Sequence, residues 1–431
     1  MKWSRYNFLF KSERYGLFIY NSVTNAFLKL NDELYQICKK IEVDGSNISL
    51  LDDEIKDGFI QSKILTTAFE ENNYITQTTY LKRLRSYDYR TLGLVIAPTY
   101  TCNFACPYCY EHNMPDYHMA EQTEDQIISF IKTFHQVKDV QICWHGGEPL
   151  LRFNNIKSLI TKIKNTKEIN LAKHHIVTNG YLLDEEKCTF FKEVGLDSVQ
   201  ITIDGLEATH NINRKHKSGK PTFDTIIKNI DHLLNSYPEC KINLRVNIHD
   251  GNKEEYPELR KQILEKWVDK NIYLYFSYVQ NHGQCQVACL ENKNKLQFSV
   301  DLYKNHGINE VELYPTSKLG GCTADTNQSY IIGPKGELYK CWVDLGKKDK
   351  EIGHIADTKL NLSLISEYVV GTDKYSDAKC IDCFLFPVCD GGCGLYRFDY
   401  KKYGKDYNVC PINPEDLNLL LELFYEKQIQ K

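Results

Sequence analysis

The stretch Thr101-Cys102-Asn103-Phe104-Ala105-Cys106-Pro107-Tyr108-Cys109-Tyr110 decides how the rest of the chain is interpreted. It places three cysteines at x3 and x2 spacing in one short loop. Three thiolates from one loop can ligate three irons of a four-iron cube, which leaves the fourth iron without a ligand from the loop. A structural zinc ion needs four closed ligands, and no further Cys or His follows at zinc-finger spacing. His112 is the one alternative fourth ligand close by.

The cysteine count is the outlying number in the composition. Sixteen cysteines occur among 431 residues, below the ~8–10% of a disulfide scaffold. A formal net charge of −4 gives no basic face for nucleic acid. No run of ~18 apolar residues predicts a membrane span, and charged residues interrupt the N-terminal segment too early for a signal peptide. We therefore expect a cytoplasmic protein that uses thiols as metal ligands.

From residue 91 to about residue 280, short apolar strands alternate with helical patterns. The expected strands are 92–97, 140–144, 175–177, 198–203, 243–248 and 272–278, and the expected helices lie near 121–134, 154–163, 184–194, 222–234 and 254–267. This alternation predicts a parallel βαβ sheet, open or barrel-like. Six repeats fall short of the eight of a full barrel.

The flanking segments have different patterns. Residues 1–90 begin with three strand patterns at 7–10, 16–20 and 26–30, and a helix follows from Asp32 with Asn31 as its N-cap. A second helix is expected near 51–59, and the Lys/Arg-rich stretch 82–90 is interpreted as a polar linker. Residues 281–431 are rich in loops and cysteines and end in a helix from Pro414 to about Lys427. The expected domains are therefore 1–90, 91–280 and 281–431.

Seven further cysteines form an ordered set in the last segment. Thirteen residues separate Cys322 from Gly336, and then come Gly336-x4-Cys341, Cys380-x2-Cys383-x5-Cys389-x3-Cys393 and finally Cys410. The remaining six cysteines are scattered. Four cysteines at x2, x5 and x3 spacing are also compatible with zinc, taken alone.

The first cysteine loop, which follows the first expected barrel strand, resembles that of the radical S-adenosylmethionine (radical SAM) enzymes. The resemblance implies an α/β fold with a partial (β/α)6 TIM barrel. It also implies that the open iron binds the amino and carboxylate groups of S-adenosylmethionine. One electron then splits the cofactor into methionine and a 5′-deoxyadenosyl radical, which takes a hydrogen atom from the substrate.

The resemblance extends to the ends of the following expected strands. Gly146-Gly147-Glu148-Pro149 matches the family's Gly-Gly-Glu-Pro motif; glycines permit close backbone approach, and the Glu148 carboxylate suits the cofactor's ammonium. The other residues that the resemblance implies as cofactor contacts are Tyr108, Thr178, Asn179, Asp204 and Arg214. A guanidinium at position 214 suits the cofactor carboxylate. All of these lie where strands end, as barrel sites do.

The second cysteine set resembles the SPASM domain, an extension of some radical SAM enzymes that holds two auxiliary iron–sulfur clusters. The family arrangement implies an outer cluster on Cys380, Cys383, Cys389 and Cys410, and an inner cluster on Cys322, Cys341 and Cys393. Three [4Fe–4S] clusters are then expected in all. Relatives with a complete inner cluster have another cysteine about six residues before the first, where this chain has Thr316. Either Cys285 or Cys289 replaces it, or the inner cluster has an open iron.

The resemblance implies two alternative substrates. The favoured one is a ribosomally made precursor peptide. Residues 1–90 would then form a winged-helix-like recognition element, to which the leader of the peptide binds by strand addition. The alternative role for residues 1–90 is a structural cap on the barrel. The product would be an oxidative crosslink (a thioether or a carbon–carbon bond) or an epimer, and the electron donor a reductase, flavodoxin or ferredoxin. The second is sulfatase maturation, in which an Asp follows the Cys of Gly-x4-Cys. Here Trp342 follows Cys341, which disfavours it.

Overall fold

The computed structural model describes residues 1–429 except 113, 283–284, 309–314, 316–320, 406–408, 412 and 414–415. The chain divides into two compact units. Residues Asp88–Asn309 and Gln328–Ile365 form one, here called the barrel unit. Residues Met1–Tyr87, Glu310–Asn327 and Ser366–Lys431 form the other, here called the terminal unit because it contains both ends of the chain. Within the described ranges, no helix is long and apolar enough to cross a membrane.

A parallel sheet forms the centre of the barrel unit. Its strands are β6 (Thr91–Ile96), β7 (Asp139–Trp144), β8 (Leu171–Thr178), β9 (Ser198–Thr202), β10 (Lys241–Ile248) and β11 (Ile272–Tyr278). They pair in sequence order, and each pair is parallel. The six strand predictions are therefore confirmed, as is the α/β class. Beyond β6 the sheet continues with β12 (Ser329–Ile332), β13 (Glu337–Tyr339) and β14 (Gly353–His354).

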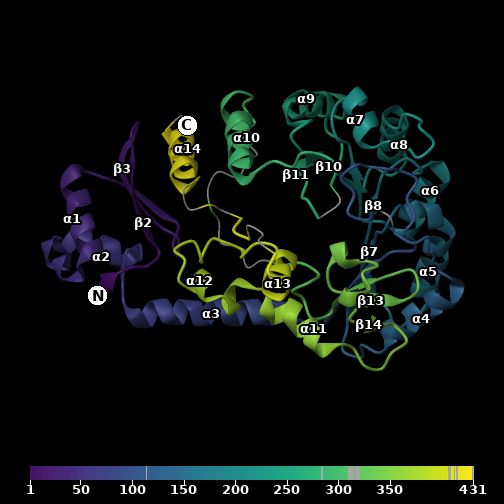
Figure 1. Ribbon diagram of the computed structural model, residues 1–431, viewed down its shortest axis with the longest axis horizontal. Coiled ribbons are helices and arrows are strands. Elements are labelled where there is room, and N and C mark those ends of the chain that lie inside the picture. The colour runs from purple at the N-terminus through teal and green to yellow at the C-terminus, as the bar shows by residue number, and fades with distance from the viewer. Residues whose placement is uncertain are drawn as a thin grey trace. The chain divides into compact units, whose positions relative to one another are not determined.

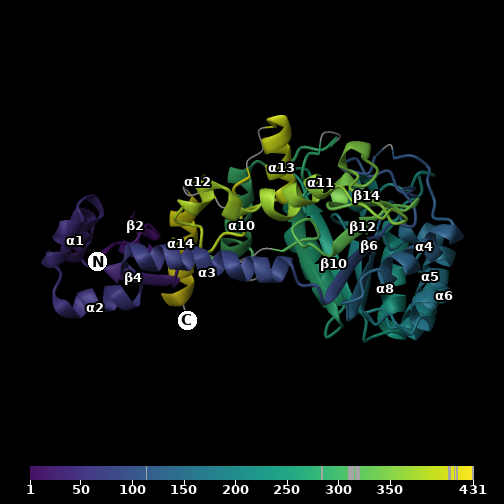
Figure 2. The same cartoon turned by 90° about the horizontal axis from the view of Figure 1, so that it is seen from below.

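Amphipathic helices surround this sheet on its outer side (Figure 1). They are α4 (Glu121–Lys132), α5 (Phe153–Asn165), α6 (Glu185–Val194), α8 (Phe223–Ser236) and α9 (Tyr256–Lys266), with α7 (Glu207–Asn213) and α10 (Asn292–Lys304) as additions that the pattern did not predict. In α5, buried Ile156, Leu159 and Ile163 recur at helical spacing and face the sheet side. Figure 2 shows α4, α5, α6 and α8 on one side of β6 and β10. Because strands β6 to β11 are parallel, the loops that follow them lie at one edge of the sheet.

The N-terminal part of the terminal unit is a small α+β assembly. Its elements are β1 (Lys2–Trp3), β2 (Asn7–Ser12), β3 (Gly16–Asn21), β4 (Ala26–Leu30), α1 (Asp32–Val43), α2 (Asp53–Gln61), β5 (Leu65–Thr66) and α3 (Ala68–Ser86). The order β2-β3-β4 is antiparallel. The Asn31 side chain accepts a hydrogen bond from Leu34 N at 2.8 Å, which confirms the predicted N-cap.

The predicted polar linker at 82–90 was wrong over its first half, because α3 continues to Ser86. Its basic residues make ion pairs within the terminal unit: Lys82 Nζ lies 2.7 Å from Asp325 and Arg83 Nη1 lies 2.6 Å from Asp373. Lys82 is buried although it is charged. The buried residues of α3 are Glu71, Lys82 and Ser86, so a hydrophobic pattern could not reveal the helix.

The β2-β3-β4 sheet packs on both faces. One face contributes Ile19 to a core with Cys38, Ile41 and Phe59 from α1 and α2. The other contributes Phe10, Phe18 and Tyr20 to a core with residues of the cysteine-rich segment and of α14 (Leu417–Ile429), namely Leu385, Val388, Leu417 and Leu421.

Of the predicted final helix, Pro414 and Glu415 lie outside the described residues. The remaining helices are α11 (Leu362–Ser366), α12 (Ala378–Ile381) and α13 (Gly394–Tyr403).

The capping box of α3 gives a test of this assembly. Thr67 Oγ1 accepts from Glu70 N at 3.1 Å, and Glu70 Oε2 accepts from Thr67 N at 3.0 Å. Thr67→Ala should lower the free energy of unfolding by about 1 kcal/mol, as measured by urea denaturation followed by circular dichroism. Thr76→Ala, on an exposed part of the same helix, should change it by less than about 0.5 kcal/mol. Equal effects of the two variants would contradict the capping assignment.

Candidate functional site

The cysteine loop follows β6 and brings its three thiols together in the barrel unit. Electrostatic interactions connect Cys102 with Cys106 and Cys109, and Cys109 with Cys106. Burial raises the pKa of the Cys109 thiol to about 12, because a thiolate there would lose its hydration. Cys109 N donates to Cys106 O at 3.2 Å, which closes the turn. His112, the alternative fourth ligand, is exposed.

The two glycines after β7 permit close packing against the backbone that leads into this loop. Gly146 has φ +106°, and a Cβ at Gly146 would lie 2.4 Å from Thr99 O. A Cβ at Gly147 would lie 2.3 Å from Thr101 O. Glu148 N donates to Thr101 O at 2.9 Å. These glycines therefore allow their own backbone to approach the backbone of the segment that ends one residue before Cys102.

Glu148 ties the loops after β7 and β8 together. Its carboxylate is fully buried and accepts hydrogen bonds from Leu150 N at 3.0 Å, Thr178 Oγ1 at 2.7 Å and Asn179 N at 2.7 Å. Burial raises the pKa of Glu148, and the three donors oppose that shift. Asn179 Nδ2 in turn donates to Asn103 Oδ1 at 2.7 Å.

Asp204, Tyr108 and Arg214 form a buried web beside the thiols. Tyr108 Oη donates to the Asp204 carboxylate, and Arg214 Nη1 donates to Tyr108 Oη at 3.1 Å and lies 3.5 Å from Asp204 Oδ2. Arg214 is 8% exposed, whereas its neighbours Lys215 and Lys217 are exposed. Asn247, at the end of β10, completes the web, since its backbone N donates to Asp204 Oδ1 at 2.7 Å.

The donor set fits an iron–sulfur cluster with a carboxylate-bearing ligand. Arg214 Nε is buried and has no hydrogen-bond partner among the described residues, and such an N–H is costly unless a ligand accepts from it. A carboxylate is the acceptor that a guanidinium fork favours. No three or more His, Cys, Asp or Glu in the described ranges are arranged around a single metal ion.

A second buried group, which the sequence did not reveal, lies behind the loop. Tyr110 Oη lies 3.2 Å from His145 Nε2, and Glu111 Oε1 lies 3.6 Å from His145 Nδ1. The His145 ring contacts that of Trp342, with 4.6 Å between centroids. Burial raises the pKa of Glu111 to about 8 and lowers that of His145 to about 4. The only sequence signal was the position of Tyr110 and Glu111 directly after Cys109.

The expected outer cysteine set lies within the terminal unit. Electrostatic interactions connect Cys380 with Cys410, Cys383 with Cys410, and Cys389 with Cys380. Of the expected inner set, Cys322 and Cys393 interact in the terminal unit, whereas Cys341 belongs to the barrel unit.

Cys285 and Cys289 lie side by side in the barrel unit, with 3.7 Å between their sulfurs. Gln286 N donates to Pro107 O at 2.9 Å, which anchors this segment to the cysteine loop. The sequence raised both cysteines as alternative ligands, and that role stays a prediction.

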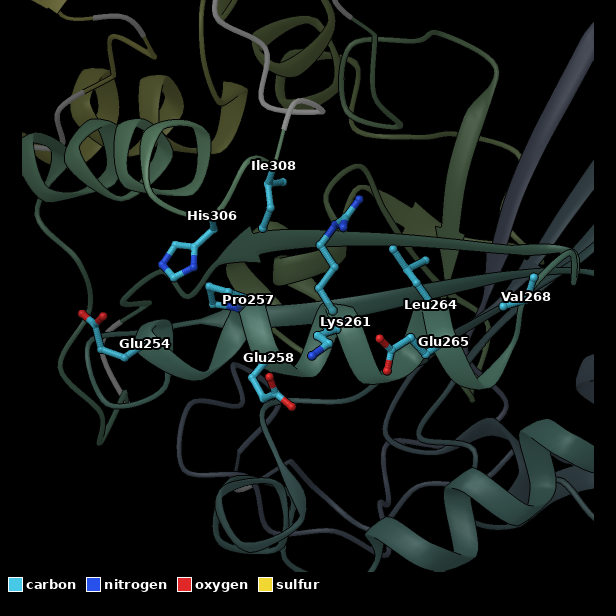
Figure 3. Close-up of a pocket in the computed structure, with 10 residues that line it drawn as sticks. Glu254, Pro257, Glu258, Lys261, Leu264, Glu265, Val268, His306 and Ile308 are labelled. Carbon is cyan, nitrogen blue, oxygen red and sulfur yellow. The ribbon is translucent and has the colours of Figure 1, made fainter.

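A separate groove of about 600 Å³ lies along α9 (Figure 3). It is lined by Glu254, Pro257, Glu258, Arg260, Lys261, Leu264, Glu265, Val268, His306 and Ile308. None of the motif residues lines this groove, so it is distinct from the cysteine loop.

The chain is similar to several known proteins. Residues 96–263 match the Radical SAM superfamily. The chain is 24% identical to the serine-type anaerobic sulfatase-maturating enzyme of Klebsiella aerogenes over 319 residues, which are 68% of this chain and 76% of the relative. It is also 24% identical to the cysteine-type enzyme of Clostridium perfringens (strain 13 / Type A), over 71% of this chain and 90% of the relative.

Two solved structures share the fold. The structure of anSMEcpe with bound AdoMet covers 79% of this chain and 98% of its own, with a TM-score of 0.61 and 20% identity. Streptococcus suis SuiB bound to S-adenosylmethionine covers 96% of this chain and 100% of its own, with a TM-score of 0.56 and 17% identity. The family match identifies a radical SAM domain over residues 96–263, and the two solved structures show that the chain shares their fold. A radical SAM domain implies S-adenosylmethionine and a [4Fe–4S] cluster as cofactors.

The glycine packing gives a direct test of the site. In Gly147→Ala the new Cβ would overlap Thr101 O, so the segment before Cys102 must shift. The free energy of unfolding should fall by about 1–3 kcal/mol, and iron bound after anaerobic reconstitution should fall by up to about four per chain. Gly58→Ala, whose Cβ would meet nothing within 4 Å, should leave the iron content unchanged. Full iron content in Gly147→Ala would refute the packing argument.

Proposed function

We propose that this enzyme is a maturase that introduces an oxidative crosslink, a thioether or a carbon–carbon bond, into a ribosomally made precursor peptide. The observation that carries the proposal is Trp342. Trp342 directly follows Cys341, at the position where the sulfatase-maturating enzymes have an Asp that acts as a base. The ring of Trp342 packs against His145. An indole cannot accept a proton from substrate. Asp344, two residues on, is fully buried.

Cofactor binding is assigned to the buried residues of the barrel unit. Cys102, Cys106 and Cys109 hold the cluster, and the unpartnered Nε of Arg214 receives the carboxylate of S-adenosylmethionine. Gly146, Gly147, Glu148, Thr178 and Asn179 shape the loops around it, and Asp204 fixes Tyr108 and Arg214. When bound, cluster and cofactor supply a 5′-deoxyadenosyl radical that removes a hydrogen atom from the peptide.

Residues 1–87 are assigned to leader recognition. The three-stranded sheet β2-β3-β4 precedes helices α1, α2 and α3 in this segment, with the short strand β1 before the sheet and β5 between α2 and α3. This resembles the order of three strands and three helices in the peptide-recognition element. The match to SuiB covers 96% of the chain, so it must include most of this segment. SuiB is also known with a bound precursor peptide, SuiA. β4 is an edge strand bonded to β3, with Leu28 37% exposed. A leader would add to that edge through main-chain hydrogen bonds.

Seven cysteines outside the radical SAM loop are assigned to two auxiliary [4Fe–4S] clusters. Cys380, Cys383, Cys389 and Cys410 hold the outer one, and Cys322, Cys341 and Cys393 hold the inner one with Cys285 or Cys289, or with an open iron. Forming the crosslink removes two hydrogens in total, so one further electron and a proton must leave the substrate after the first hydrogen atom. An auxiliary cluster held by these cysteines would serve as the acceptor for that electron, and a flavodoxin, ferredoxin or reductase would supply the initiating one.

Sulfatase maturation is the second candidate, and the names of the curated relatives favour it. Those relatives match 68–71% of this chain. The two candidates differ in the protein that carries the product, because oxidation of a serine to formylglycine also removes two hydrogens.

Co-expression distinguishes the two candidates. Small open reading frames beside the gene are each expressed with the enzyme, and peptide masses are measured. A loss of two hydrogens that disappears in the Cys102→Ala, Cys106→Ala and Cys109→Ala variants is expected. Conversion of a co-expressed sulfatase with every peptide unchanged would instead establish the second candidate. Reconstituted protein should carry about 12 irons, or about eight in the loop variants, and chelation of iron should abolish release of 5′-deoxyadenosine.

The role of Arg214 is tested by cofactor affinity. Arg214→Met should weaken S-adenosylmethionine binding to the iron-loaded protein by about 10–100-fold, because a charge-assisted hydrogen bond worth about 1.5–3 kcal/mol is lost. Isothermal titration calorimetry under anaerobic conditions measures this. Lys215→Met removes the same charge from an exposed neighbour and should bind normally. An unaltered dissociation constant for Arg214→Met would remove this residue from the site.

A further inference from the structure

Arg397 is a buried cation that donates directly to a cysteine sulfur. It lies on α13, is 3% exposed, and its Nη2 is 2.9 Å from Cys380 Sγ. Its other donors are engaged as well, since Nη1 pairs with Asp377 at 2.6 Å and Nε donates to Gly391 O at 2.6 Å. The guanidinium is thereby fixed on three sides with one edge directed at Cys380.

A second buried cation lies beside the same cysteines. Lys374 is 4% exposed, and its Nζ donates to Phe386 O at 2.6 Å and to Cys389 O at 2.7 Å. Both cations interact electrostatically with Cys380. Two positive charges so placed and withdrawn from water need compensating negative charge, and Asp377 supplies one.

We propose that Arg397 sets the reduction potential of the outer auxiliary cluster. With Arg397 present, this potential is higher than it would be with the four cysteine ligands alone. The proposal rests on the assignment of Cys380, Cys383, Cys389 and Cys410 to that cluster. Arg397 is a positioning residue here: it acts through the sulfur of Cys380.

The physical reason is the charge that reduction adds. Four thiolates around an oxidised cube already make the site anionic, and a further electron increases that charge. A guanidinium 2.9 Å from a ligand sulfur stabilises the reduced form more than the oxidised one, and burial strengthens the effect because water screens it less. Hydrogen bonds to cluster sulfurs are an established determinant of cluster potential.

Arginine suits this position better than lysine. Its planar fork can hold Asp377, Gly391 O and Cys380 Sγ at once, and its charge does not depend on pH. An outer cluster with a raised potential accepts an electron more readily, which is the role that the proposed crosslinking reaction requires of it.

Two substitutions with opposite expected signs test the proposal. Arg397→Met removes the cation and should shift the midpoint potential of the outer cluster to a lower value. Asp377→Asn leaves Arg397 in place without its counter-charge and should shift the potential to a higher value; Asn retains the helix-capping oxygen of Asp377. The potentials are measured by anaerobic redox titration with electron paramagnetic resonance, on full-length protein with its iron content determined.

Lys402→Gln is the matched control. It removes one positive charge from the same helix, α13, at an exposed position near Glu367, and it should leave the potential unchanged. An Arg397→Met protein with full iron and an unshifted potential would overturn the proposal. If Arg397→Met fails to retain the cluster, the Asp377→Asn variant decides alone. In that case, a midpoint potential that does not rise in Asp377→Asn would overturn the proposal. A wild-type protein without an outer-cluster signal would instead refute the ligand assignment itself.

Discussion

The buried carboxylate of Glu148 is the interaction on which the rest of the candidate site depends. It accepts three hydrogen bonds from the loops after β7 and β8, and it belongs to the turn that packs against Thr99 and Thr101. Three chain segments that are far apart in sequence are thus fixed at one edge of the sheet. Because the cysteine loop begins one residue after Thr101, its position follows from this arrangement. A buried carboxylate whose two oxygens both accept hydrogen bonds makes such a junction rigid.

The parallel sheet was predictable because its strands are continuous apolar runs separated by amphipathic helices. The cysteine loop could be recognised because its spacing is local, and the role of its cysteines as ligands stays a prediction. The roles of individual motif residues were less accessible. Gly146 and Gly147 permit close approach of the chain to itself, and this depends on where Thr99 and Thr101 lie in space, which spacing within one motif does not specify.

Long-range polar contacts account for most of what the sequence did not predict. Tyr108, Asp204 and Arg214 meet although about a hundred residues separate the first from the other two. The Tyr110–His145–Trp342 contacts likewise join three distant segments. Helix α3 was missed for a related reason. Its buried side chains are polar or charged and are satisfied by partners such as Asp325, so they leave no hydrophobic period in the sequence.

The two faces of the β2-β3-β4 sheet have a consequence for how the chain is made. One face packs against α1 and α2, which are synthesised within the next forty or so residues. The other face, with Phe10, Phe18 and Tyr20, packs against Leu385, Leu417 and Leu421. During translation those aromatic side chains stay uncovered until Leu385, Leu417 and Leu421 have been synthesised. The N-terminal assembly therefore exposes one apolar sheet face from the time it is synthesised until residues more than 350 positions later in the chain can cover it.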